Sequence, residues 1–436
     1  MNRNHYFFIF LIYSFSVLIY LGLTKAFLSI DLDLSLVLYS VWFFSFWLVS
    51  IDRGLLSPVM FFLLSCTVFV FSRAFLYKIG MEPVEAGIQL GEKSYVIAFN
   101  EGFLIALFIS IFYVISTFLL KSPMRRFIKN IFFDYRIGIG RYDFSPIFLL
   151  FSIFFLALFL IKSYGLIGLV SNSSYLELAG GDALSSHIKY FFIGKNALIL
   201  YLIFSCNRNK YLYASLLLFF SSIGFGFIGL RGYLIVYFLL FAYFFSLRGI
   251  IGNKSILLAV ASMVYVSSVI MEYRLGFDLY SGVWDVAIKT IHQQGATFEV
   301  LYGVVNFSEE VNSCVESSYR VSSSVDFGSC VDRSRGVFWE YGGFATSFFA
   351  EAVYLGFFYS VIYSVIFGFF LAMLDRLSKL QRKVSSHSLV PSLLLFLVLP
   401  NLVYFARGDV NDFIFKTLIS LILIFSLRIT VKFLRT

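Results

Sequence analysis

The sequence predicts an all-α membrane protein with about twelve transmembrane helices, and two observations lead to that fold class. Of the 436 residues, 60% are hydrophobic and only 14% are charged, which leaves too little polar surface for a water-soluble fold. Apolar runs of about 16 to 25 residues recur along the chain, and each is long enough to cross a hydrocarbon core as a helix. Helices are expected because backbone groups in lipid need partners within their own segment.

The apolar runs place the expected spans in order within one transmembrane domain, residues 1–436. They cover residues 5–22, 32–51, 55–72, 102–120, 146–161, 190–205, 211–229, 233–247, 255–271, 347–374, 389–405 and 413–427. The first run has a basic start but no small-residue cleavage site after it, so we expect a retained helix. The sixth and seventh helices are joined only by residues 206–210, unlike the long central connection of a two-halved transporter.

Lysine and arginine are unevenly distributed between the two sets of connecting loops. If both termini are cytoplasmic, the cytoplasmic side holds 19 of the 34 basic residues and only 4 of the 25 acidic ones. Cytoplasmic loops of membrane proteins carry such an excess. The net charge of +9 therefore indicates orientation in a lipid bilayer and gives little reason to expect a nucleic acid partner.

One long connection, residues 272–346, lies between the ninth and tenth expected helices on the outer side of the membrane. It contains Cys314 and Cys330, and an oxidising exterior favours a disulfide between them. Residues 281–294 within it have apolar side chains at the spacing of a one-sided helix, with Trp284 suited to a membrane interface. We expect this amphipathic helix to lie on the outer membrane surface like a lid.

Arginines are expected at two tight turns on the outer side. Arg231 interrupts an otherwise uncharged run over residues 211–247, whose glycines predict a tight turn between two helices. Arg407 occurs in similar surroundings between the last two helices, beside Asp409. A guanidinium binds phosphate bidentately, and its burial in a membrane costs roughly 2.5 to 3.5 kcal/mol unless it faces a polar cavity. The two arginines together favour an anion site; the alternative is that Arg231 reaches the head groups or pairs with a carboxylate such as Glu351.

Four motifs resemble the bacterial O-antigen polymerases, multi-helix proteins that join lipid-linked oligosaccharide repeat units. The motifs are GLRGYLIVYFLL at 229–240, EYRLG at 272–276, GGFATSFFAEAVYLGFF at 342–358 and ARGDVNDFIFKT at 406–417. The enterobacterial common antigen polymerases have a similar order of features. The motifs fall in the C-terminal half of the chain, and the helix pattern extends the resemblance to its full length.

The resemblance implies a membrane glycosyltransferase, a polysaccharide polymerase that uses no metal or other cofactor. It would work at the periplasmic face of the bacterial inner membrane, in lipopolysaccharide biosynthesis. The growing glycan would leave undecaprenyl diphosphate and pass to a hydroxyl of an incoming lipid-linked unit. Arginines can neutralise the leaving diphosphate, and only a base for the hydroxyl is then needed. The resemblance leaves open whether a chain-length regulator protein binds alongside.

Under this hypothesis the charged residues of the outer loops form two groups. The diphosphates would be bound by Arg231, Arg274 and Arg407. The candidate bases, in decreasing order of preference, are Glu351, Asp409, Glu299 and His292.

Structural roles compete with these assignments. Arg274 could anchor a helix end at the interface, and Glu351 could satisfy a neighbouring arginine. Asp409 precedes the last helix, where carboxylates commonly cap an N-terminus. His292 lies on or near the expected lid helix, where an ordinary surface histidine is the simpler interpretation.

Two other functions are consistent with parts of the sequence. Asp31 and Asp33 form a paired-carboxylate pattern typical of a different, metal-dependent class of polyprenyl-phosphate glycosyltransferase, although helix capping explains them well. A flippase or exporter of lipid-linked oligosaccharides would also need arginines facing phosphates. Such a carrier should have charges in a central cavity, whereas here they gather at the outer ends of the spans.

Overall fold

The secondary-structure elements that the computed structural model describes are all helices. It describes residues 3–27, 31–50, 56–81, 92–120, 145–167, 182–205, 208–275, 283–321, 327–334, 347–383, 389–408, 413–415, 417–420, 422 and 426. Within these residues, 6 helices are long and apolar enough to cross a membrane, and four shorter apolar helices accompany them. An all-α membrane protein is therefore the fold class, while the number of twelve spans and the orientation stay predictions.

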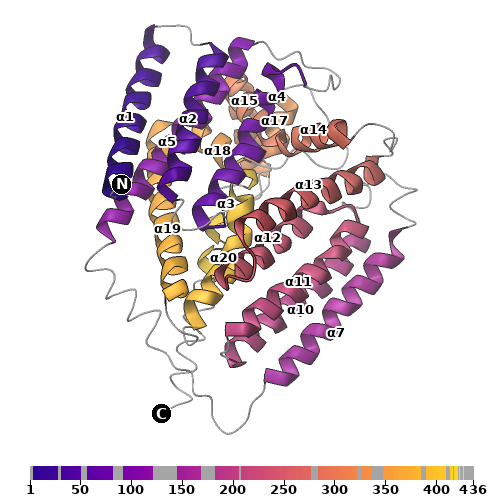
Figure 1. Ribbon diagram of the computed structural model, residues 1–436. Coiled ribbons are helices and arrows are strands. Elements are labelled where there is room, and N and C mark those ends of the chain that lie inside the picture. Colours follow the sequence, from indigo (N-terminus) through magenta and orange to yellow (C-terminus); the bar gives the residue numbers. More distant parts are fainter. Residues whose placement is uncertain are drawn as a thin grey trace. The chain divides into compact units, whose positions relative to one another are not determined.

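The described helices form two compact units, each assembled from separate stretches of the chain. Unit 1 comprises Met1–Ser122, Ile291–Arg376 and Leu402–Phe415, and unit 2 comprises Pro123–Thr290, Leu377–Asn401 and Lys416–Thr436. In Figure 1 the N-terminal helices in indigo share unit 1 with helices from the orange part of the chain. Unit 1 thus brings together segments that are far apart in the sequence.

Unit 1 contains most of the residues from which a site is built. Its complete helices are α1 (Arg3–Phe27), α2 (Leu32–Ser50), α3 (Pro58–Ser65), η2 (Cys66–Phe71), α4 (Ser72–Lys78), α5 (Glu92–Leu119), α15 (Ala296–Asn306), α16 (Ser308–Val321), α17 (Phe327–Ser334), α18 (Phe348–Tyr354) and η3 (Phe405–Arg407). The last residues of α14 (Val283–Gln294) and α20 (Leu389–Tyr404) also belong to it, as does most of α19 (Phe357–Lys383). Here η2 is a π-helix and η3 a 3₁₀-helix.

The third expected span is longer than the sequence predicts. The prediction ends it at residue 72, yet α3, η2 and α4 continue as one apolar helical run over Pro58–Lys78. The apolar pattern is interrupted by Arg73, whose side chain is buried. A buried charge that is paired inside the fold does not end a helix, so the hydropathy boundary at residue 72 is wrong.

The tenth expected span, residues 347–374, is two helices in the structure. The helix α18 starts at the N-cap Ser347, whose hydroxyl accepts the N–H of Ala350, and it ends at Tyr354. Gly356 then adopts a φ of +93°, a conformation that residues with a Cβ rarely adopt, before α19 begins at Phe357. This glycine separates a short helix of seven residues from the long span that follows.

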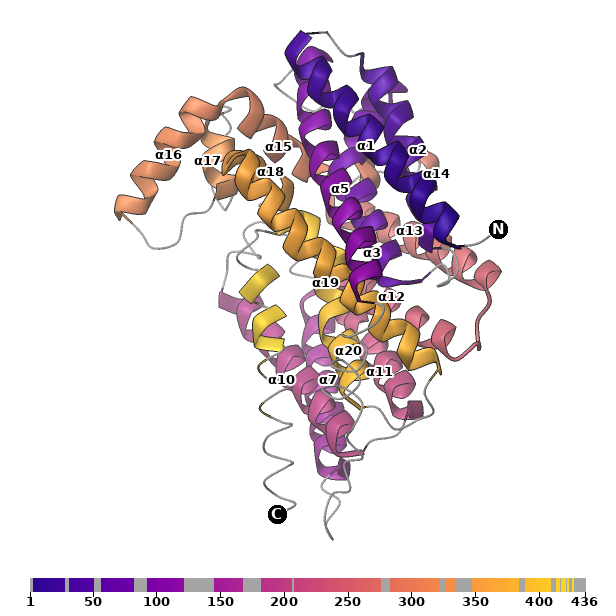
Figure 2. The same cartoon turned by 90° about the vertical axis from the view of Figure 1, so that its left-hand side faces the viewer.

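Residues 283–334 of the long connection are largely helical, and α15 is part of the core of unit 1. Its side chains Phe298, Val300 and Leu301 are fully buried. It packs against α5, η2, α18 and α17, and Figure 2 shows α16 and α17 beside α15 and α18. The position of this connection on the outer side of the membrane stays a prediction, and the structure adds that α15 is packed among other helices of unit 1.

A disulfide joins α16 to α17 within the same connection. It links Cys314 to Cys330, the pair that the sequence predicts, with their Cα atoms 5.5 Å apart. Cys330 and its neighbour Val331 are buried, and α17 packs on both α15 and α16. The crosslink therefore closes a small helical subdomain onto the core helix α15.

Unit 2 is a layer of neighbouring helices. It contains α7 (Ser145–Gly165), α10 (Asp182–Ser205), α11 (Arg208–Phe227), α12 (Arg231–Leu247) and α13 (Asn253–Leu275), which lie side by side in Figure 1. The predicted tight turn between the seventh and eighth spans is present, with Gly229 at a φ of +78°. Arg231 is the first residue of α12. The expected twelfth span, residues 413–427, is described only in part, at 413–415, 417–420, 422 and 426.

Candidate functional site

A buried ion pair links α4 to α15 in unit 1. The guanidinium Nη1 of Arg73 contacts the carboxylate Oε1 of Glu299, and the two side chains are 5% and 13% exposed. Removing a charged pair from water is costly, and it is tolerated when each partner is satisfied by the other. Glu299 thus has a structural partner, so the sequence-based interpretation of this residue as a base meets a competing role.

Arg73 also binds the backbone where the chain turns from α14 into α15, which we call the corner. Its Nε donates a hydrogen bond of 3.0 Å to the backbone carbonyl oxygen of His292. A second tie comes from Thr297, whose hydroxyl donates to the carbonyl oxygen of Phe69 on η2. The corner, residues 292–299, is therefore attached to η2 and α4 at three places.

Close packing at Gly295 adds to these attachments. A Cβ atom on this residue would lie 2.6 Å from the hydroxyl oxygen of Ser72 and 2.7 Å from Cγ of Arg73. Real Cβ atoms essentially never approach heavy atoms so closely, so only glycine fits here without a shift of α4 or of the corner. The absence of a side chain lets the two segments touch.

Arg407 makes a different kind of contact with the same corner. Its Nη1 donates a hydrogen bond of 3.0 Å to the amide oxygen Oε1 of Gln294. The guanidinium is half-buried, and among the described residues it has no carboxylate partner. Asp409, the acid expected beside it, lies outside the described residues. Among the described residues, Arg407 is thus held by a neutral group.

Glu351, the preferred base in the sequence analysis, lies on a helix that packs against the element ending at Arg407. It occupies the first turn of α18 and is half-buried. The neighbouring rings of Phe348 and Phe349 lie 5.6 and 5.9 Å from the ring of Phe405 on η3, the short helix that ends at Arg407. Unit 1 therefore packs the element carrying the preferred base against the element carrying one of the proposed phosphate ligands.

His292 is not the surface residue that its sequence context suggests. Its side chain is 2% exposed, at the end of α14 where the chain turns into α15. The helix itself is present as expected, and Trp284 near its start is 81% exposed. The amphipathic pattern thus predicted the helix correctly, but it did not show that the far end of the helix is packed into unit 1.

Three of the predicted site residues cannot be placed in this cluster. Arg231 and Arg274 belong to unit 2, and the structure does not describe their side chains. Asp409 lies outside the described residues. The expected convergence of Arg231 with Arg407 therefore stays a prediction.

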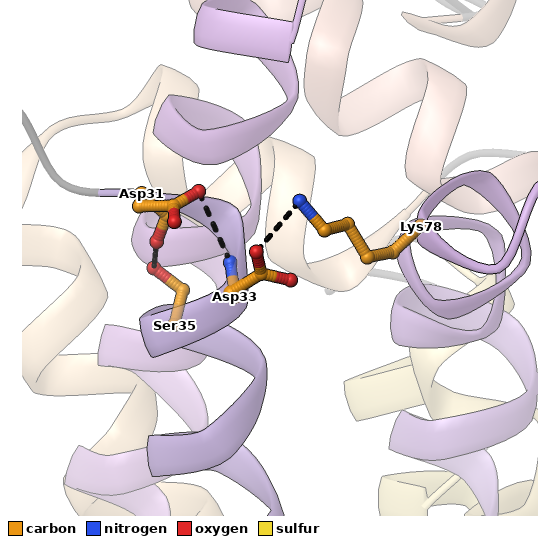
Figure 3. Close-up of polar contacts among 4 residues, drawn as sticks. All are labelled: Asp31, Asp33, Ser35 and Lys78. Carbon is orange, nitrogen blue, oxygen red and sulfur yellow. Dashed lines mark hydrogen bonds and ion pairs between the residues drawn. The ribbon is translucent and has the colours of Figure 1, made fainter.

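The two aspartates of the alternative glycosyltransferase reading have ordinary structural partners, shown in Figure 3. The carboxylate of Asp31 accepts the backbone N–H of Asp33 at 3.4 Å, at the start of α2. Asp33 forms an exposed ion pair of 2.8 Å with Lys78 at the end of α4. Capping and a surface ion pair thus account for both carboxylates. In the described part of the chain, no three His, Cys, Asp or Glu side chains gather closely enough to hold a metal ion.

Arg73 and Gln294 were not recognised as site residues from the sequence. A signal for Arg73 did exist, because it is a lone charge in an apolar run, the same pattern that singled out Arg231. It was interpreted instead as the end of a span. Gln294 gives no signal of its own, since a glutamine at a helix end is unremarkable until its partner is known.

Comparison with known proteins supports the resemblance seen in the motifs. The chain is 38% identical over 268 residues to a protein from Escherichia coli described as "O-antigen polymerase". The chain is similar to an O-antigen polymerase. The match covers 61% of this chain and 60% of the O-antigen polymerase from Escherichia coli, so it spans about three fifths of each protein. No family model and no solved structure matches the chain.

Proposed function

We propose that this protein polymerises an oligosaccharide by joining repeat units carried on undecaprenyl diphosphate. The similarity to the O-antigen polymerase of Escherichia coli supports the reaction class. The observation that carries the site is the half-buried guanidinium of Arg407, which the described residues hold through a neutral amide and not through a carboxylate. Such a cation in an apolar fold is suited to an anionic ligand.

In the proposed reaction, the bond between the reducing-end sugar and the diphosphate of the donor lipid breaks. A hydroxyl of the acceptor unit forms the new glycosidic bond, and its proton passes to a base. Undecaprenyl diphosphate leaves with the bonding electrons, and Arg407 stabilises the negative charge that develops on it. Arg231 and Arg274 are proposed as further diphosphate ligands, on the donor or the acceptor lipid.

Glu351 is the proposed base. It is half-buried on α18, and α18 packs against η3, which ends at Arg407. An acceptor hydroxyl bound near Arg407 would therefore lie near α18. Asp409 is the second choice because it follows Arg407 closely in the chain. Glu299 ranks lower in this proposal because its carboxylate is engaged by Arg73, and His292 ranks lower because it is 2% exposed.

The site is proposed to face the periplasm, with both termini cytoplasmic and the protein in the inner membrane. The charge distribution between the loops supports this orientation. We propose no metal in the reaction, because permanently charged guanidinium groups can stabilise the leaving diphosphate.

The test is glycan synthesis in a polymerase-deletion strain that makes the matching repeat unit. Arg407→Ala should reduce polymerisation by about 100-fold or more, and the cells should then make glycan of single, unpolymerised repeat units. Loss of a flippase would instead strand repeat units on the cytoplasmic leaflet. Long chains made at the wild-type rate by Arg407→Ala protein would remove Arg407 from the site, and inhibition by EDTA would favour the metal-dependent class.

A further inference from the structure

Gln294 is held in place by the contacts of its neighbours as well as by its own hydrogen bond to Arg407. It is the last residue of α14, directly before Gly295, whose close packing leaves no room for a side chain. Two residues earlier, the carbonyl oxygen of His292 accepts the hydrogen bond from Arg73. The backbone on both sides of Gln294 thus contacts α4. These contacts fix the backbone of Gln294 and so restrict where its side-chain amide can lie.

The amide oxygen of Gln294 engages only one edge of the Arg407 guanidinium. The hydrogen bond runs from Nη1 over 3.0 Å, and a guanidinium carries five N–H donors in a planar fork. This hydrogen bond restrains the rotation of the guanidinium. The remaining donors then point in set directions, which is the arrangement that bidentate phosphate binding requires.

Glutamine itself adds no negative charge to offset that of Arg407. Unit 1 contains the opposite case, since Arg73 is neutralised by the carboxylate of Glu299. A glutamate at position 294 would have the same size and could accept the same hydrogen bond, but its charge would cancel that of Arg407. The choice between an amide and a carboxylate therefore decides whether the guanidinium can attract an anion.

We propose that Gln294 is a positioning residue that orients Arg407 through a neutral acceptor, so that the guanidinium meets the diphosphate of the lipid carrier with its full charge. This inference rests on the proposed function, in which Arg407 binds that diphosphate. In this proposal, the corner at residues 292–299 orients Arg407.

The decisive variant is Gln294→Glu, because it keeps the size and the hydrogen-bond acceptor toward Arg407 while adding a negative charge. The measurement is binding of undecaprenyl diphosphate to the full chain in phosphatidylcholine nanodiscs, together with thermal unfolding. Gln294→Glu should weaken binding about tenfold or more without lowering the unfolding temperature. Gln294→Ala, which loses the orientation but keeps the charge, should weaken binding about threefold.

Controls separate this inference from the function on which it depends. Asn312→Asp adds one negative charge on an exposed position of α16 and should bind undecaprenyl diphosphate as the wild type does. Arg407→Ala tests the proposed function itself. If Arg407→Ala protein loses binding while Gln294→Glu protein retains it, Gln294 is only a structural hydrogen-bond acceptor and the inference fails. If Arg407→Ala protein binds normally, the proposed role of Arg407 fails first.

A competition measurement distinguishes binding of undecaprenyl diphosphate from binding of an ordinary anionic lipid. Phosphatidylglycerol added to the nanodiscs in tenfold excess over undecaprenyl diphosphate should leave binding of the carrier unchanged. Displacement of the carrier by phosphatidylglycerol would overturn the assignment to a diphosphate, because a single phosphate on any lipid would then suffice.

Discussion

Two arginines in unit 1 contact the same corner of the chain, yet their surroundings differ in kind. Arg73 is 4% exposed and pairs with the carboxylate of Glu299. Arg407 is half-buried and contacts the neutral amide of Gln294. The partner decides what each cation can do. A neutralised, buried guanidinium holds helices together, whereas an uncompensated one in a partly open position can bind an anion.

The comparison also explains why a membrane protein would use both arrangements close together. A charged side chain in an apolar environment is costly unless it is paired or faces water or a ligand. Arg73 meets that condition through Glu299, and its hydrogen bond to the backbone at residue 292 stiffens the support on which Arg407 depends. The ion-paired Arg73 thus holds the backbone of the corner whose Gln294 contacts Arg407.

The largest expected effect on stability comes from breaking the buried pair. Arg73→Met should destabilise the folded protein by about 3 to 5 kcal/mol, because the largely buried carboxylate of Glu299 would lose the positive charge that it contacts. The measurement is unfolding of the detergent-purified protein on heating. The matched variant Arg407→Met should lose only about 1 kcal/mol, the worth of one hydrogen bond to a neutral partner. Equal losses in the two variants would contradict the contrast between these arginines.

Removing both charges of the buried pair should restore much of that stability. In Arg73→Met/Glu299→Met protein no charge is left unpaired, and apolar side chains of similar length can fill the space. We expect the double variant to recover at least half of the lost free energy of unfolding. It should still bind undecaprenyl diphosphate more weakly than the wild type, because the hydrogen bond to the backbone of His292 is also lost. Full binding in the double variant would show that the corner needs no such support.

Gly295→Ala tests the close packing of the corner with an intermediate effect. The added Cβ would meet Ser72 and Arg73 at under 3 Å, so the corner or α4 must move, at a cost of about 1 to 3 kcal/mol. The control is Gly22→Ala on α1, where a Cβ would meet nothing within 4 Å. That change should be neutral or slightly stabilising, because alanine favours a helix. A thermal shift as small as that of the control would mean that the corner adapts freely.

The smallest effect is expected at the exposed ion pair. Asp33→Asn removes one ion pair of Lys78, but the aspartate is 57% exposed, so the free energy of unfolding should change by about 0.5 kcal/mol or less. Glycan polymerisation should also stay near the wild-type rate. Abolished polymerisation in a stable Asp33→Asn protein would support the carboxylate-dependent glycosyltransferase class instead.

Much of the fold could be predicted because hydropathy and glycine act locally. The apolar runs located the helices, and the glycines before Arg231 predicted the turn that the structure has at Gly229. Cys314 and Cys330 could be paired because they were the two cysteines of one connection. These features depend on residues near one another in the sequence.

The parts that could not be predicted depend on distant partners. Burial of Arg73 requires Glu299, which follows it by more than half the chain, so hydropathy alone placed a helix end there. The break at Gly356 was invisible because a single glycine in an apolar run is common in membrane helices. Likewise, α15 is too short to be recognised as a span, and only its contacts with α5 and η2 make it a core helix.

The π-helix η2 affects the direction of the charged side chain that follows it in the third span. A wider turn accommodates one extra residue, and a single insertion into an α-helix rotates everything that follows by about 100° around its axis. Arg73 follows η2 almost immediately, so its direction depends on that widened turn. If Cys66–Phe71 formed a regular α-helix instead, the same number of residues would turn the Arg73 guanidinium about 100° away from Glu299.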